Sequence, residues 1–399
     1  MMSKFQNFFN SISQVSPLAW KLLIRERTRS VVAIIGIGFA ALLMYMQLGF
    51  QSGLLSSATN FYRSLDADIF IISRATTNSG SYQLFPQSLL YRSFGFDRVS
   101  EVIPLYITNI RVQSLDGVKP VSLRLIGLDP SVDLFNIDKV STQMSKLTKS
   151  GYVLFDELSS KIAGPVASSF KTDKRVDLIS SDYTNTFTVA GLFKLGSTFA
   201  ADGNLITSNS TMVELAFRQL NPGEISLGAV RVRNKSDISS IKKKLGSLYG
   251  TELEVLTKKE LIKREKDYWN QTTALGATFG FGTIMGFLVG GVIVYQVLYT
   301  DIVDHLKEYA TLKAIGFTQK YLLIVVLQQS IILAILAFLP ATFASLVLYS
   351  LLSGITNIAI VMTSSMVIKV GLLMLTVCSI SAIIATRKLR EADPASVFN

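Results

Sequence analysis

The chain has 399 residues, a formal net charge of +11, 49% hydrophobic residues and a mean hydropathy of +0.41. Its single cysteine, Cys378, and its single histidine, His305, exclude an intrachain disulfide framework and a Cys/His metal cluster. The apolar residues form blocks long enough to cross a bilayer, which takes about 20 residues. The basic clusters lie beside these blocks, which favours a role in membrane orientation over the binding of nucleic acid.

Residues 1–30 are expected to form a cytoplasmic segment with a short interfacial helix. Ser16 followed by Pro17 is a helix-start pattern, and Trp20 among cations suits the headgroup region. A membrane-proximal linker is the alternative. Residues 31–50 are the first predicted span. Because five cations precede it and no convincing cleavage site follows, an uncleaved anchor with a cytoplasmic N-terminus is favoured over a signal peptide.

Residues 51–270 are predicted to form one large extracytoplasmic α+β domain, because short β-rich runs alternate with helical pieces. We expect stalk helices at both its ends and leave open a division into two lobes near residues 164–174. The predicted strands are 68–73, 102–107, 110–115, 121–128, 176–179, 187–192, 204–207 and 229–232. The predicted helices are 86–91, 156–163, 210–220 and 237–249.

The second span, residues 271–299, is predicted to continue a charged helix that starts outside the membrane. Thr257 and Glu260 have the spacing of a capping box, and no proline interrupts the chain between them and the span. A continuous helix from Lys258 to Tyr299 would be about 60 Å long. That is about twice the thickness of the bilayer core, so a stalk would protrude into the extracytoplasmic domain.

Glycines recur at four-residue spacing in this span. They form one pair, Gly276/Gly280, and one group of three, Gly282/Gly286/Gly290. Such spacing opens one face of a helix to the close approach of another helix, within the chain or across a dimer. The alternative is the ordinary enrichment of glycine in membrane helices.

Residues 300–320 connect the second and third spans, and their core, 301–317, is predicted to be one amphipathic cytoplasmic helix. We expect this coupling helix to dock an energy-supplying partner; a simple connector lying on lipid is the alternative. Gly316 is expected to end the helix as a C-terminal cap. The candidate docking residues are Ile302, Leu306, Glu308, Tyr309, Leu312, Lys313, Ile315, Gly316 and Phe317.

Two further spans are predicted at residues 321–352 and 367–386, joined by a short outside loop at 353–366. Pro340 is expected to bend or interrupt the third span, with a turn at 353–357. Arg387, Lys388 and Arg390 open a C-terminal tail, 387–399, and hold it in the cytoplasm. The predicted topology is therefore a four-span α-helical membrane protein with both termini cytoplasmic.

The chemistry in the sequence favours a non-catalytic subunit. No G-x-x-x-x-G-K-[ST] motif occurs, so any P-loop ATPase must be a separate chain that binds ATP and Mg²⁺, and this chain is expected to need no cofactor or metal. The predicted spans lack Asp, Glu and Arg, which argues against an ion-coupled transporter. We interpret His305 as a solvated helix residue and Cys378 as an apolar filler.

Seven segments, in order along the chain, resemble DevC-type permeases of cyanobacterial ABC exporters, and more broadly MacB, LolC/LolE and FtsX permeases. They are PLAWKLLIRERTRS (17–30), GIGFAALLMYMQLGFQSGLL (36–55), LDADIFIISR (65–74), LIGLDP (125–130), FKLGSTFAADGNLITSN (193–209), KEYATLKAIGF (307–317) and KLREADPASVF (388–398). The last two are shared widely among MacB-like permeases, and the first five are typical of the DevC type.

The resemblance implies a homodimer in the cell inner membrane with a MacB-like architecture. A DevA-like ATPase would bind the coupling helix, and a DevB-like periplasmic adaptor would bind the large domain and join it to a TolC-like channel. Hydrolysis of ATP would move the stalk helices, and the periplasmic domain would drive a lipid, glycolipid or other hydrophobic substrate outward, a mechanism called mechanotransmission. The alternatives are an FtsX-like regulator of a cell-wall enzyme and a lipoprotein-release permease.

Overall fold

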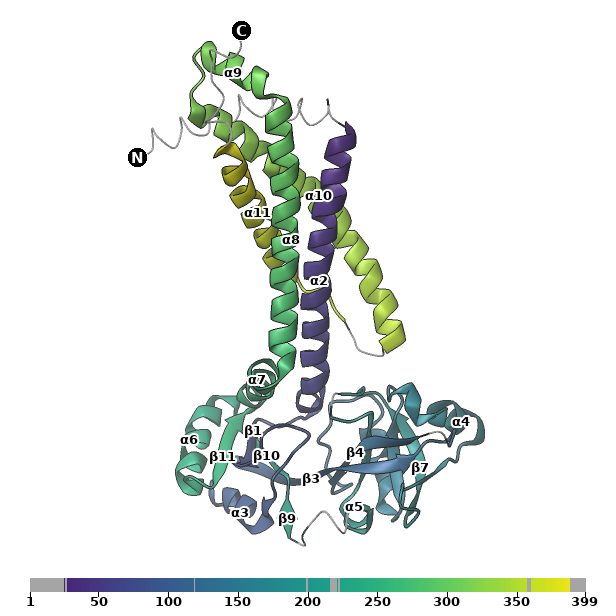
Figure 1. Cartoon of the computed structure of the whole chain (residues 1–399). Coiled ribbons are helices and arrows are strands. Elements are labelled where there is room, and N and C mark those ends of the chain that lie inside the picture. The colour runs from purple at the N-terminus through teal and green to yellow at the C-terminus, as the bar shows by residue number, and fades with distance from the viewer. Residues whose placement is uncertain are drawn as a thin grey trace. The chain divides into compact units, whose positions relative to one another are not determined.

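The computed structural model describes residues 25, 27–117, 119–198, 200–215, 221, 223–356 and 360–387 (Figure 1). The predicted interfacial helix beginning at Ser16, with Trp20, and the C-terminal tail from Lys388 onward lie outside the described residues. The chain divides into two compact units. The helical unit comprises 1–52, 276–352 and 360–399, and the sheet unit comprises 53–275 and 353–359.

Four helices are long and apolar enough to cross a membrane. They are α2 (Arg27–Ser64), α8 (Ala274–Asp304), α10 (Gln319–Thr356) and α11 (Ser364–Ala385). Each contains an 18-residue window with a mean hydropathy of at least 1.9, and the large α+β domain lies in sequence between the first and the second. The predicted fold class, a four-span helical membrane protein with this inserted domain, is confirmed.

Polar side chains join these helices inside the helical unit. Tyr349 of α10 donates a hydrogen bond to the backbone oxygen of Tyr45 on α2 and contacts the sulfur of Met366 on α11 at 3.4 Å. The hydroxyl of Ser381 on α11 donates to the backbone oxygen of Gly291 on α8, at 2.9 Å. Such bonds satisfy groups that lipid cannot, so they fix which helices are neighbours.

The predicted continuous helix from Lys258 to Tyr299 is wrong. Helix α7 (Lys258–Asp267) passes into a π-helical turn, Tyr268–Thr272, and Thr273 is extended, with φ −104° and ψ 158°. The hydroxyl of Thr273 donates to the backbone oxygen of Trp269 and accepts from the N–H of Leu275. One threonine therefore terminates the first helix and caps the second, a role that threonine side chains favour.

The third span is more continuous than the sequence predicted. Helix α10 runs through Pro340 and on to Thr356, so the expected interruption is absent and residues 353–356 of the predicted turn are helical; Asn357 lies outside the described residues. Proline is tolerated in membrane helices because neighbouring groups satisfy the freed backbone. Helix α11 begins at Ser364, where the side chain of Thr363 accepts from the N–H of Met366.

The sheet unit contains a nine-stranded mixed sheet in the order β11-β1-β10-β3-β4-β8-β5-β7-β6. A two-stranded sheet, β2 (Phe85–Pro86) and β9 (Glu224–Ile225), accompanies it. The strands of the main sheet are β1 (Ile69–Ser73), β3 (Val99–Gln113), β4 (Pro120–Leu128), β5 (Tyr152–Asp156), β6 (Asp177–Ile179), β7 (Thr186–Phe193), β8 (Gly203–Ser208), β10 (Leu227–Val232) and β11 (Leu253–Thr257).

Strand β3 joins two lobes of this sheet. Its first half, up to Leu105, pairs with β10, and its second half, from Tyr106, pairs with β4. In Figure 1, β1, β10 and β11 lie to one side of β3, and β4 and β7 lie to the other. The division near 164–174, which the sequence left open, does not fall there, because that segment holds α4 (Val166–Asp173) inside one lobe. The two predicted strands 102–107 and 110–115 are one strand.

Two strands of the main sheet, β5 and β11, and both strands of the small sheet, β2 and β9, were missed, and one predicted helix is absent. The segment 156–163 was expected to be helical, but Asp156 ends β5 and starts a turn. Its buried carboxylate accepts from the N–H groups of Leu158, Leu195 and Gly196 and from the amide of Asn204. Long-range hydrogen bonds thus override a local helical pattern. The short strands β5 and β11 lie between charged or turn-forming residues that hid them.

Helix α4 was not predicted, whereas three other helices of the sheet unit agree with expectation within a few residues. They are α3 (Gln87–Tyr91), α5 (Asn209–Leu215) and α6 (Ile238–Tyr249); residues 216–220 of the predicted third helix lie outside the described residues. Helix α6 buries Ile241, Leu245 and Tyr249 against the β1–β10 lobe. The capping box at Thr257 and Glu260 is confirmed, with both reciprocal hydrogen bonds present.

Candidate functional site

The predicted coupling helix is broken at His305. Helix α8 continues to Asp304, His305 has φ −100° and ψ 18°, and a separate helix α9 (Leu306–Ala314) follows. The imidazole Nδ1 of His305 lies 2.9 Å from the backbone oxygen of Asp301, one turn back in α8. The histidine side chain therefore contacts the end of the spanning helix and is not the freely solvated residue that the sequence suggested.

Most of the predicted apolar face points into the protein. Ile302, now part of α8, and Tyr309 of α9 are buried, and Leu306 and Leu312 are half-buried. The exposed members of the predicted set are Glu308, Ile315, Gly316 and Phe317, while Lys313 is half-buried. Ile315 is 72% exposed, which is unusual for so large an apolar side chain. The surface open to a partner therefore consists of Glu308, in the first turn of α9, and of Ile315, Gly316 and Phe317, which follow its last turn. We call these four residues the α9 tip.

The α9 tip has a fixed backbone. Gly316 has φ +105°, its N–H donates to the oxygen of Lys313, and the N–H of Phe317 donates to the oxygen of Leu312. These two bonds are those of a Schellman C-cap, which requires a left-handed residue at the glycine position. The prediction that Gly316 ends the helix is confirmed. The ring of Phe317 then packs on Tyr321, with centroids 4.7 Å apart.

Ion pairs tie this region to the start of α2. Arg29 lies 2.7 Å from Asp304, and Arg25 lies 3.5 Å from Glu308. All four side chains are at least one-third exposed, so each pair contributes less than about 1 kcal/mol. Burial raises the pKa of Tyr309, whose hydroxyl has no hydrogen-bond partner among the described residues. Packing against apolar neighbours, rather than polar bonding, therefore holds α9 in place.

The glycine face of α8 has a partner helix inside the chain. A Cβ placed at Gly286 would lie 3.0 Å from Met44, one at Gly290 would lie 3.1 Å from Ala40, and one at Gly282 would overlap Gln47. All three contacts are on α2. By contrast, a Cβ at Gly280 would meet nothing within 4 Å. The sequence predicted a close helix–helix contact without naming the partner; the structure places α2 there.

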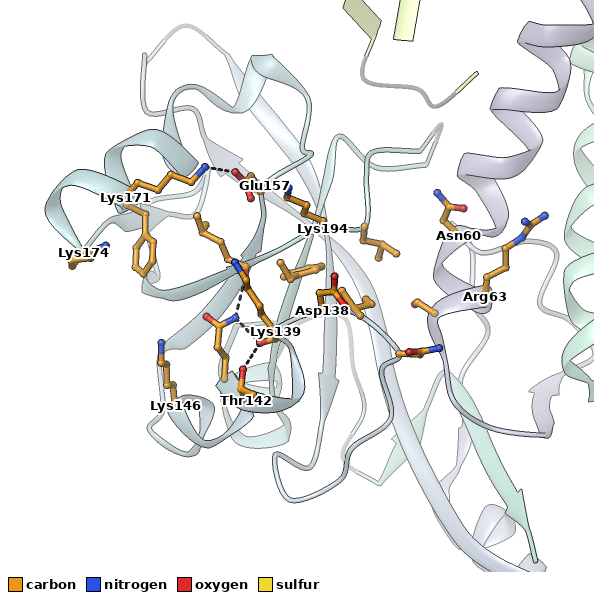
Figure 2. Close-up of a pocket in the computed structure, with 18 residues that line it drawn as sticks. Asn60, Arg63, Asp138, Lys139, Thr142, Lys146, Glu157, Lys171, Lys174 and Lys194 are labelled. Atoms are coloured by element: carbon orange, nitrogen blue, oxygen red, sulfur yellow. Dashed lines mark hydrogen bonds and ion pairs between the residues drawn. The ribbon is translucent and has the colours of Figure 1, made fainter. Parts of the chain in front are cut away.

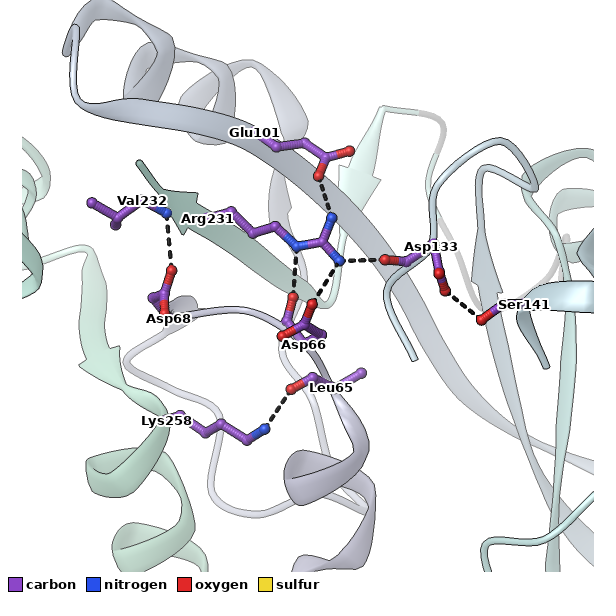
Figure 3. Close-up of polar contacts among 9 residues, drawn as sticks. All are labelled: Leu65, Asp66, Asp68, Glu101, Asp133, Ser141, Arg231, Val232 and Lys258. Carbon is purple, nitrogen blue, oxygen red and sulfur yellow. Dashed lines mark hydrogen bonds and ion pairs between the residues drawn. The ribbon is translucent and has the colours of Figure 1, made fainter. Parts of the chain in front are cut away.

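Within the sheet unit, the end of α2 and the start of α7 are joined by a cluster of polar contacts (Figure 3). Lys258, the first residue of α7, donates to the backbone oxygen of Leu65 at 2.6 Å. Arg231 of β10 donates to the backbone oxygen of Asp66 at 2.7 Å and to Glu101 of β3 at 2.6 Å. A third bond goes from Arg231 to the backbone oxygen of Asp133. Arg231 thus holds the segment that follows α2 against the strands of the sheet.

A second, buried cluster lies at the other end of α7. Glu265 is 2% exposed, and its carboxylate accepts from the N–H and hydroxyl of Ser79 and from the indole N–H of Trp269. Arg124 of β4 is 1% exposed, donates to Ser79 at 3.4 Å and lies over the ring of Phe61 on α2. We call Arg124, Ser79, Glu265 and Trp269 the root cluster, because it connects α7 and its π turn to the sheet and to α2.

The root cluster could be found in the sequence only in part. Arg124 interrupts the apolar strand VSLRLIGL, which marks it as a buried charge in need of a partner. Glu265 gives no such signal, because it lies in a helix of alternating charges. Among the described residues, no group of three or more His, Cys, Asp or Glu side chains is placed to hold a metal ion.

The comparison with protein families gives one match. Residues 280–394 match the family model for the FtsX-like permease C-terminal domain. This segment contains most of α8 and all of α9, α10 and α11. The part of the chain that holds the second, third and fourth spans, with the α9 tip, is therefore similar to that permease domain. No curated protein matches the chain at a significant level.

Solved structures similar to the chain cover about half of it. One is the extracellular domain of the ABC-type transporter YknZ from Gram-positive bacteria, with 13% identity over 48% of this chain and 98% of that chain and a TM-score of 0.33. The periplasmic region of MacB from Actinobacillus actinomycetemcomitans has 13% identity, 50% and 92% coverage and a TM-score of 0.31. A domain of a putative permease from Porphyromonas gingivalis has 11% identity, 48% and 86% coverage and a TM-score of 0.29.

Proposed function

We propose that this chain is the permease subunit of an ABC-type exporter and works with a separate ATPase. The observation that carries the proposal is the match of residues 280–394 to the FtsX-like permease domain, in a chain with four candidate spans. The sequence contains no P-loop, so the energy of ATP must reach it through a partner. Its own role is then mechanical and non-catalytic.

The α9 tip is the proposed docking surface for that ATPase. Ile315 offers an exposed apolar anchor, which the Schellman cap around Gly316 presents on a fixed backbone, and Glu308 offers an exposed charge in the first turn of the same helix. A preorganised apolar anchor with a polar rim is what a stable protein interface requires. The residues Leu306, Tyr309 and Leu312, which were expected to contact the partner, would instead pack α9 on its own unit.

Charge supports a topology in which both termini and α9 are cytoplasmic. Arg25, Arg27 and Arg29 precede the apolar part of α2, and Arg387, Lys388 and Arg390 follow α11. Positive charge of this kind marks the cytoplasmic ends of spans. With four spans, the sheet unit then lies outside the inner membrane, where it would meet a periplasmic adaptor joined to a TolC-like channel.

The proposed mechanism is mechanotransmission. ATP-driven movement of the ATPase would displace α9 and α8, and the root cluster and the Arg231 contacts would carry the movement of α2 and α7 into the sheet. Rigid, fully packed elements transmit displacement well because packed cores do not deform continuously. The displaced periplasmic domain would drive a lipid, glycolipid or other hydrophobic substrate outward through the adaptor and channel.

A homodimer would form through α8. Its exposed side chains Phe281, Met285, Leu288, Val292 and Tyr295 follow one another at spacings of four, three, four and three residues. This is the seam of two packed helices, and α8 is the least buried of the four spans. Cysteine placed at Leu288 should cross-link between two copies, whereas cysteine at the equally lipid-exposed Ile368 of α11 should not.

The test of the proposed function is purification of the tagged chain from its native membranes, with mass-spectrometric identification of the proteins that accompany it. The proposal expects an ATPase and an adaptor in stoichiometric amounts with two copies of this chain. A cell-wall hydrolase in place of the adaptor would contradict export and indicate an FtsX-like regulator. A complex without any ATPase would contradict the proposal altogether.

A further inference from the structure

One lobe of the sheet unit and the end of α2 enclose an open pocket of about 1000 Å³ (Figure 2). Its lining comes from the end of α2, the segment 136–146, helix α4 with the residue after it, the residue that follows β5, and the end of β7 with the two residues after it. Figure 2 shows Asn60 and Arg63 of α2 on one side of the opening and the lysines of the lobe on the other. No residue of this pocket belongs to the α9 tip or to the root cluster.

The pocket is strongly cationic. Its two acidic side chains are Asp138 and Glu157, and they leave an excess of four positive charges. A hydrogen bond from Lys171 lowers the pKa of Glu157, and the charges of Lys194 and Lys139 act in the same direction, so this carboxylate stays ionised near neutral pH. Its cationic residues are Arg63, Lys139, Lys146, Lys171, Lys174 and Lys194.

Two of these lysines have unfavourable backbone conformations. Lys139 has φ +69° and Lys174 has φ +57°, and among the described residues Tyr183 is the one other non-glycine residue with positive φ. A left-handed conformation costs a residue with a Cβ about 1–2 kcal/mol, and glycine avoids that cost. Folding alone would therefore favour glycine at both positions. Strain retained at such positions points to a use for the side chain.

The pocket also has an apolar side. Ile137 and Leu195 are partly buried and pack against the core cluster that contains Phe193, whereas Phe170 and Leu192 pack against the neighbouring core cluster. All five residues line the pocket. An apolar floor with a few polar groups around it is typical of sites for small ligands, and the volume is at the upper end for such sites.

We propose that this pocket binds a phosphorylated amphiphile, with the phosphate between the lysines and a hydrocarbon chain on the apolar floor. Lysine binds phosphate as a point charge, and several lysines around one opening match a group that carries up to two negative charges. A neutral lipid would leave the cations uncompensated. A free phosphate would leave the apolar floor in water.

The pocket lies against the last turn of α2, so an occupied pocket contacts the helix that the proposed mechanism moves. Binding of the amphiphile needs no ATPase. If the pocket bound no amphiphile, the proposal that an ATPase docks on the α9 tip would still stand. If no ATPase docked there, the proposed binding site would still stand.

The test is native mass spectrometry of the full-length chain in an uncharged maltoside detergent, titrated with lysophosphatidic acid. We expect saturable binding of one ligand per chain. The double variant Lys139→Gly/Lys174→Gly removes two charges and relieves two left-handed residues, so it should keep its thermal stability and bind roughly tenfold more weakly or worse. Lys194→Gln is a second variant that leaves both of these backbone positions unchanged, and it should weaken binding too.

The matched control is Lys243→Gln/Lys244→Gln, which removes two exposed charges from α6, outside the pocket, and should bind like the unmodified chain. A monoacylglycerol with the same hydrocarbon chain, and inorganic phosphate, should each bind far more weakly than lysophosphatidic acid. Equal binding by the pocket variants and the control would overturn the proposal. Equal binding of the monoacylglycerol would show a purely apolar site, and full displacement by equimolar phosphate would show a simple anion site; either would contradict it.

Discussion

The α9 tip and the root cluster are two polar regions with opposite construction. At the α9 tip, Glu308 is exposed, its ion pair with Arg25 is solvated, and Ile315 projects into solvent. The nearby ion pair between Asp304, at the end of α8, and Arg29 is solvated as well. In the root cluster, Arg124 and Glu265 are almost fully buried and are joined through Ser79. Exposed pairs contribute little to stability, whereas a buried charge that loses its partner is costly. The first region has the exposed construction of the proposed docking surface, and the second has the buried construction of a stable core contact.

The largest effect is expected in the root cluster. Glu265→Ala leaves Arg124 buried without a carboxylate in its network and removes the carboxylate that accepts from the N–H groups of Ser79 and Trp269. The free energy of unfolding of the sheet unit should fall by about 3–5 kcal/mol. Calorimetry of the full chain in detergent measures this loss.

Two controls sharpen that result. Glu252→Ala removes an exposed carboxylate on the same unit and should change stability by less than about 0.5 kcal/mol. The double variant Arg124→Met/Glu265→Leu replaces both charges and should recover much of the loss, because apolar replacements of a buried pair are often tolerated. If the stability loss of the double variant equalled the sum of the losses measured for Arg124→Met and for Glu265→Leu alone, the two residues would not form one cluster.

The next effect concerns the face that joins α8 to α2. Gly286→Leu would drive a side chain into Met44 and the backbone oxygen of Ala40 and should destabilise the helical unit by about 1–3 kcal/mol. Gly280→Leu, one and a half turns earlier, meets open space and should have little effect. Thermal unfolding of both variants in the same detergent checks the difference. Equal losses would show that the α2 contact is not the reason for the glycines.

A smaller loss is expected at the cap of α9. Gly316→Ala places a Cβ at φ +105° and should cost about 1–2 kcal/mol of local stability. Gly246→Ala, inside α6 with open space around it, should be neutral or stabilising. Hydrogen exchange of the amides of residues 312–317 reports the first effect. Unchanged protection at Phe317 would contradict the assigned Schellman cap.

The smallest effect is expected for the exposed ion pair between Asp304 and Arg29. Asp304→Asn should lower the free energy of unfolding by less than about 1 kcal/mol, and the loss should shrink as salt is added. Thermal unfolding at low and high ionic strength measures it. A loss as large as that of Glu265→Ala would remove the contrast between the two regions.

The sequence predicts the parts of this fold that depend on local pattern. The four apolar helices, the capping box at Thr257, most strands and the cap at Gly316 all follow from composition, spacing or a single residue. The breaks at Thr273 and His305 do not follow, because each depends on a side chain that bonds a backbone oxygen four residues back. The sequence also could not predict that α10 continues through Pro340, because this depends on the groups that surround the proline.

The candidate sites also separate into a part that local sequence pattern predicts and a part that depends on contacts between distant residues. The sequence located the region around α9 but assigned its apolar face to a partner, because periodicity shows that residues share a face and not what covers that face. Tyr309 is buried, and Ile315 is exposed. The root cluster and the cationic pocket combine residues up to about 190 positions apart in sequence, and no local pattern connects Ser79 with Glu265 or Arg63 with Lys194.

The most direct test of the central claim is site-specific cross-linking from the α9 tip in native membranes. Cys378 is fully buried, so a cysteine introduced by Ile315→Cys is selectively labelled with a photoactivated cross-linker. Ile162→Cys, at an exposed isoleucine on the sheet unit, is the matched control; Ile162 is 57% exposed. The account predicts that the position 315 probe captures an ATPase and the position 162 probe does not. Capture of the ATPase from position 162, or of lipid alone from position 315, would contradict it.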